Sequence, residues 1–114
     1  MLRIISALAL ALVLATAISS AETVQDIKIT ASKFQFSPNE ITVKKGQPVK
    51  LEVLSSDANH GLTIPAFGIR GDAKKGDTAT FEFTPKEAGT FQGKCAHFCG
   101  KGHGSMIMTV HVVE

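Results

Sequence analysis

Apolar and polar residues alternate with a period of two along most of the chain. A period of two buries one face of a β-strand, and several short strands about ten residues apart are typical of a sandwich or barrel. We therefore predict an all-β antiparallel sandwich. The apolar positions that define the strands are Ile27 and Ile29, Phe34 and Phe36, Ile41 and Val43, Val49 to Val53, Leu62 and Ile64, Phe81 and Phe83, Phe91, and Met106 to Val112.

Two stretches depart from this alternation. The stretch from Ala66 to Asp77 is rich in glycine and charged residues, so we expect it to form a loop. The stretch from Ile4 to Ile18 is an uncharged apolar run of 15 residues, preceded by Arg3 and followed by small residues up to Ala21. This order is typical of a secretory signal peptide, and the run is shorter than the roughly 20 residues that span a bilayer.

We predict a signal peptide at residues 1–21, a domain at residues 22–114, and export to the periplasm. Without cleavage, the same segment would instead anchor the protein in the membrane. No later segment is apolar enough to cross a membrane. The chain of 114 residues is long enough for one small domain.

The charge of the chain gives no argument for a nucleic-acid or anionic-membrane partner. The formal net charge is +2 and falls to about +1 without Arg3, which favours neither nucleic acid nor an anionic membrane. A core of this size is thin and is often supplemented by a disulfide or a metal. Two cysteines in an exported chain would ordinarily suggest one disulfide.

One loop between two predicted strands carries most of the chemistry. Cys95, Cys99, His103 and Met106 lie within twelve residues, and thiolate and thioether ligands favour copper. A thioether is a poor ligand for zinc, so Met106 argues against a zinc site. We expect three glycines to let the backbone curl so that these side chains converge. The glycines are Gly100, Gly102 and Gly104.

A copper loop of this kind needs a second imidazole from elsewhere in the chain. His60 is the candidate, because it lies in a turn between two predicted strands. His111 has the opposite strand parity to its apolar neighbours, so we expect it at the surface. Met108 has core parity. Several alternatives stay open at this stage, including a disulfide, core packing of Met106, and a mononuclear site in which the His97 imidazole replaces a ligand.

The pattern resembles the binuclear copper (CuA) domain of cytochrome c oxidase subunit II and nitrous oxide reductase. That family has the motif Cys-x3-Cys-x3-His-x2-Met and one histidine far upstream. The resemblance implies that Cys95 and Cys99 bridge two copper ions. It assigns His60 and His103 as terminal ligands and Met106 as a weak thioether ligand. It also implies a cupredoxin-like Greek-key β-sandwich.

The family uses a backbone carbonyl between the two cysteines, which corresponds to His97. Oxidase subunits usually carry Glu at this position, where it helps to hold magnesium, and the sequence shows no membrane hairpin. We therefore expect a free-standing relative that passes electrons between partners such as a c-type cytochrome or a membrane-bound oxidase, without enzymatic activity. The alternatives are a copper carrier or chaperone, a mononuclear blue or red copper protein, and a metal-free, disulfide-linked interaction module.

Overall fold

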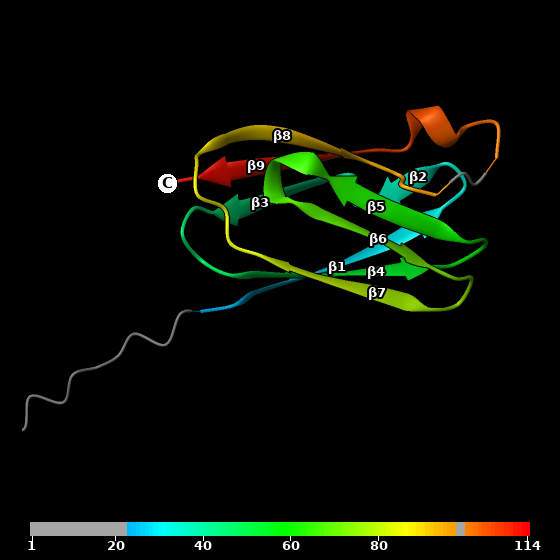
Figure 1. Cartoon of the computed structure of the whole chain (residues 1–114), viewed down its shortest axis with the longest axis horizontal. Coiled ribbons are helices and arrows are strands. Elements are labelled where there is room, and N and C mark those ends of the chain that lie inside the picture. Colours follow the sequence, from blue (N-terminus) through cyan, green and yellow to red (C-terminus); the bar gives the residue numbers. More distant parts are fainter. Residues whose placement is uncertain (1–22, 98–99) are drawn as a thin grey trace, which may run out of the picture.

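The computed structural model describes residues 23–97 and 100–114, so the predicted signal peptide and Cys99 lie outside the described residues. The described part forms two β-sheets packed face to face (Figure 1). The elements are β1 (Gln25–Ser32), β2 (Gln35–Ser37), β3 (Glu40–Lys44), β4 (Val49–Ser55), β5 (His60–Ile64), η1 (Pro65–Phe67), β6 (Ile69–Ala73), β7 (Thr78–Phe83), β8 (Gly89–Lys94), η2 (His103–Ser105) and β9 (Ile107–Val113).

One sheet has the strand order β2-β1-β4-β7 and the other has the order β3-β9-β8-β5-β6. The all-β sandwich predicted from the alternation is confirmed. Two pairs, β1 with β4 and β3 with β9, are parallel, so the sandwich is not wholly antiparallel. An alternating pattern reports which face of a strand is buried and carries no information on strand direction.

The core lies between the two sheets and is made by the inward-facing residue of each alternating pair. Leu51 and Phe36 supply it from one sheet, and Leu62 and Val110 supply it from the other. All four side chains are almost fully buried. Within the described residues, no helix is long and apolar enough to cross a membrane.

The prediction of a loop from Ala66 to Asp77 was wrong. This stretch contains the end of η1 and the whole of β6, which pairs with β5. Gly71 lies within β6, where a β-carbon would come within 3.0 Å of the Phe81 ring of the opposite sheet. The glycine therefore permits close packing, whereas the sequence pattern alone favoured a turn.

Candidate metal centre

Three predicted ligands lie at the same end of neighbouring strands in one sheet. His60 is the first residue of β5, Cys95 directly follows β8, and Met106 directly precedes β9. Strand β8 lies between the other two and is antiparallel to both. The start of β5, the end of β8 and the start of β9 therefore meet at one end of the sandwich, on the right in Figure 1.

The register between these strands brings the ligand-bearing segments side by side. The amide N–H of Cys95 donates a hydrogen bond of 3.2 Å to the carbonyl of Met106, which continues the β8–β9 pairing. On the other side, a β-carbon on Gly61 would lie 3.2 Å from that of Ala96. The residue after His60 thus packs against the residue after Cys95.

The His60 ring is fully buried, and its two nitrogens have different surroundings. Nε2 lies 2.8 Å from Oδ1 of Asp57, and Nδ1 is buried without a hydrogen-bond partner. The hydrogen bond with His60, followed by that with the amide of Lys33, holds the pKa of the Asp57 carboxyl below its ordinary value. Because an ionised carboxylate only accepts hydrogen bonds, Nε2 is the ring nitrogen that donates to Asp57, and in the neutral ring Nδ1 is the nitrogen with the lone pair.

A buried polar atom without a partner is rare in folded proteins and costs free energy unless something else binds it. Imidazole, thiol and thioether groups on neighbouring strand ends match the ligand preference of copper. The residues present therefore fit a copper ion at this end of the sandwich.

Cys95 is buried, and its thiol donates a hydrogen bond of 3.0 Å to the backbone carbonyl of His97. The imidazole of His97 is partly exposed, and its Nδ1 lies 4.0 Å from the carboxylate of Asp72. The backbone oxygen of His97 is therefore the atom close to the sulfur. This geometry favours a carbonyl ligand over an imidazole ligand at this position.

Beyond residue 99, the loop folds into one turn of 3-10 helix, η2. His103 begins this turn, and its carbonyl accepts a hydrogen bond of 3.2 Å from the amide of Met106. The Met106 side chain is fully buried. Cys99 lies outside the described residues, and among those described no three His, Cys, Asp or Glu side chains are close enough to hold an ion by themselves. The described residues therefore do not bring His103 together with His60 and Cys95 as a three-ligand group.

The three loop glycines serve different purposes. Gly100 has a φ of 136°, a conformation that favours glycine. Gly102 has an ordinary φ of −86°, but a β-carbon there would overlap the ring of Phe34, which follows β1. Gly104 has open space around it. The expectation that all three serve backbone curling therefore fits Gly100 alone.

Two further residues singled out from the sequence have no part in the candidate ligand set. His111 is partly exposed, as expected, with Nε2 at 3.2 Å from Glu40 and Nδ1 at 3.3 Å from Thr90. Met108 is buried in the core. Sequence reasoning missed Asp57, although a carboxylate three residues before a candidate histidine ligand is a usable signal for a supporting hydrogen bond.

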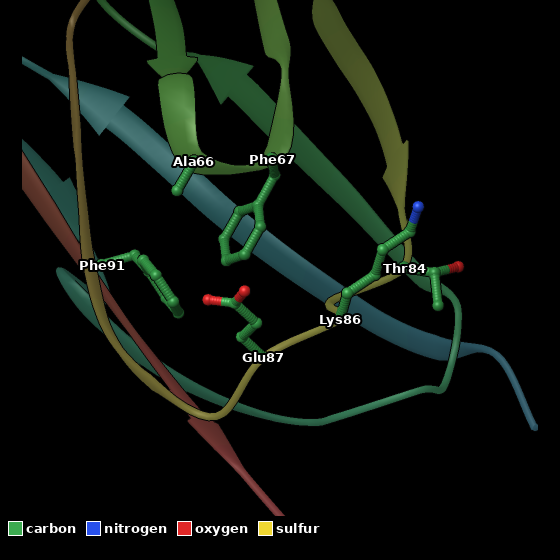
Figure 2. A pocket seen from close by; sticks show the side chains of 6 residues that line it. All are labelled: Ala66, Phe67, Thr84, Lys86, Glu87 and Phe91. Atoms are coloured by element: carbon green, nitrogen blue, oxygen red, sulfur yellow. The ribbon is translucent and has the colours of Figure 1, made fainter.

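A cavity of about 490 Å³ lies at the opposite end of the sandwich (Figure 2). It is formed near η1 and the connection that precedes β8, whereas the loop with the candidate ligands follows the end of β8. Phe67 and Phe91 meet there with ring centroids 5.2 Å apart. This cavity is separate from the candidate metal centre. Its lining consists of Ala66, Phe67, Thr84, Lys86, Glu87 and Phe91.

Comparison with known proteins agrees with this fold. The family described as "Cupredoxin-like domain" matches residues 4–108, and the chain belongs to that family. It is 41% identical over 70 residues to a probable cytochrome c oxidase subunit 2 of Streptomyces coelicolor, covering 61% of this chain and 22% of that protein. It is 30% identical over 88 residues to the subunit 2 of Thermus thermophilus, covering 77% of this chain and 65% of that protein.

Among solved structures, the chain resembles the periplasmic domain of subunit II of the cytochrome oxidase of Bradyrhizobium japonicum. The TM-score is 0.73 at 26% identity, and the match covers 79% of this chain and 84% of that one. The chain thus resembles the periplasmic domain of an oxidase subunit II. It spans less than two thirds of the length of the curated relatives described above.

Proposed function

We propose that this protein is an exported electron carrier with a binuclear, CuA-type copper centre. Cys95 and Cys99 would bridge the two metals, and His60 and His103 would each bind one of them. Met106 and the backbone carbonyl of His97 would be the weak ligands. The observation that carries the proposal is the placement of three buried residues, His60, Cys95 and Met106, at the ends of neighbouring strands, with His60 Nδ1 buried and without a hydrogen-bond partner.

The residues of the chain prepare this site before any metal binds. The sheet holds His60, Cys95 and Met106 at the ends of neighbouring strands, so their backbones are already fixed by hydrogen bonds. Burial excludes water from these three side chains. When bound, the copper pair supplies a centre that takes up and releases one electron. A rigid ligand frame favours this chemistry because the ligands move little between the two redox states.

The relatives support the choice of partners. The names of the similar proteins refer to cytochrome c oxidase subunit 2, and one of the solved structures is a periplasmic domain. We propose that the protein exchanges electrons in the periplasm with a c-type cytochrome or a membrane-bound oxidase, and that it does not itself turn over a substrate.

Copper stoichiometry combined with an EPR spectrum tests the proposal on the purified protein, reconstituted with its thiols reduced. We expect two coppers per chain sharing one unpaired electron, seen as a seven-line hyperfine pattern. One copper with a four-line pattern would favour the mononuclear alternative. The absence of bound copper would favour the disulfide-linked module. Rapid transfer of copper to a chelator would instead favour a copper carrier.

A further inference from the structure

We propose that Asp57 is a positioning residue whose two carboxylate oxygens join His60 to the turn between β1 and β2 and thereby hold Nδ1 toward the metal. This inference rests on the proposed copper site and extends it to a side chain that binds no metal itself. Asp57 precedes β5 in the connection that leads to His60.

The two oxygens of Asp57 contact different parts of the molecule. Oδ1 lies 2.8 Å from Nε2 of His60, and Oδ2 accepts a hydrogen bond of 2.8 Å from the amide of Lys33. The first contact selects the tautomer with the proton on Nε2. The second contact fixes the carboxylate to the backbone of the turn between β1 and β2, so the carboxylate cannot follow the imidazole if the ring rotates.

A carboxylate suits this position because both neighbours are donors. An asparagine has one oxygen and one NH₂ group. It could accept from His60 or from Lys33, and its NH₂ group would then face the other donor. An alanine would lose both contacts and leave Nε2 without its partner, so the ring could turn or change its tautomer.

Contacts other than those of Asp57 also hold the connection that leads to His60. A substitution of Asp57 can therefore change the position of the His60 ring without unfolding this connection. The amide of Ser56 donates a 3.0 Å hydrogen bond to the carbonyl of Ala31. Oδ1 of Asn59 accepts a 2.8 Å hydrogen bond from the amide of Lys75. Replacing Asp57 therefore leaves the backbone of this connection tied to its neighbours on both sides.

The same turn also supports the cysteine loop. Lys33 supplies the amide that binds Asp57, and the next residue, Phe34, packs its ring beside Gly100 and Gly102. One short turn thus contacts both segments that carry ligands. Asp57 is the link from that turn to the histidine.

The test compares Asp57→Ala and Asp57→Asn with Asp72→Ala as the matched control. Asp72 is also an exposed carboxylate next to a histidine, but it lies 4.0 Å from the His97 ring, outside hydrogen-bond distance. We expect Asp57→Ala to weaken copper binding about tenfold to a hundredfold, with altered nitrogen hyperfine couplings in the EPR spectrum. Asp57→Asn should recover part of the affinity, and Asp72→Ala should match the wild type.

A second measurement needs no copper. Nitrogen-15 NMR of the copper-free protein should show His60 protonated at Nε2 in the wild type and a shifted tautomer ratio in Asp57→Ala. Wild-type copper affinity in Asp57→Ala, or an Nδ1-protonated ring in the wild type, would overturn the inference. If the wild type bound no copper while the NMR result held, the proposed function would fail and the role of Asp57 in fixing the ring would stand.

Discussion

The thiol of Cys95 donates a hydrogen bond of 3.0 Å to the backbone carbonyl of His97, two residues later. The chain bends at residues 96 and 97 and brings a backbone oxygen next to the sulfur. The His97 side chain points elsewhere, toward Asp72. In the proposed centre, position 97 would contribute its main-chain carbonyl, which any residue could supply.

This arrangement predicts that His97→Ala leaves the copper centre intact. The carbonyl remains after the substitution, and the lost contact with Asp72 is an exposed pair of little energetic weight. Copper content and the EPR spectrum should equal those of the wild type. Loss of one copper would show that the imidazole is a ligand and would support the mononuclear alternative.

The two cysteines should be equally necessary for the binuclear centre. We expect Cys95→Ser and Cys99→Ser each to abolish the shared-electron spectrum, because one bridging sulfur would be missing. His111→Ala is the control, since His111 contacts Glu40 and Thr90 away from the ligands. Copper loss in His111→Ala would mean that the proposed ligand set is wrong.

Met106 and Met108 form a matched pair, because both are fully buried and lie two residues apart near the start of β9. Replacing either by Leu conserves volume and should cost less than about 1.5 kcal/mol of stability. Only Met106→Leu should raise the reduction potential, because it removes a weak donor that helps to stabilise the oxidised metal. Protein-film voltammetry measures this difference. Equal shifts in both variants would exclude a ligand role for Met106.

Gly102 and Gly104 allow a test of the packing around the loop. A β-carbon on Gly102 would come within 3.0 Å of the ring and the β-carbon of Phe34, and the latter cannot move without the backbone. We expect Gly102→Ala to destabilise the copper-free protein by about 1–3 kcal/mol in urea unfolding. Gly104→Ala has open space and should behave like the wild type.

The substitution Phe34→Ala should relieve part of the clash in the Gly102→Ala background, because it removes the ring and keeps the β-carbon. Gly102→Ala should therefore lower the free energy of unfolding less in the Phe34→Ala background than in the wild type. An equal loss in both backgrounds would show that the Phe34 ring does not set the requirement for glycine. Urea unfolding of all four proteins gives the coupling free energy directly.

The sandwich core predicts a contrast between two leucines of β4. Leu51 is fully buried, whereas Leu54 is 39% exposed. Leu51→Ala should lower the free energy of unfolding by about 2–5 kcal/mol because it leaves a cavity between the sheets. Leu54→Ala should change it by about 0.5 kcal/mol or less. Similar losses in both variants would contradict the assignment of the two strand faces.

The sequence by itself determined the class of fold and the chemistry of the loop. A period of two marks strands with one buried face, and this local property was sufficient to predict the sandwich. The spacing of Cys95, Cys99, His103 and Met106 was visible because all four lie within one short segment. His60 could be proposed only because the resemblance and the copper chemistry called for a second imidazole.

The tertiary structure alone decided how these segments meet. Three features depend on neighbours that are distant in the sequence: the parallel strand pairs, the strand β6, and the packing of Phe34 against Gly102. The same holds for the support of Asp57 by Lys33. Alternation specifies which face of a strand is buried, whereas direction, register and ring orientation follow from packing and hydrogen bonds between segments, and these form only when the two sheets come together.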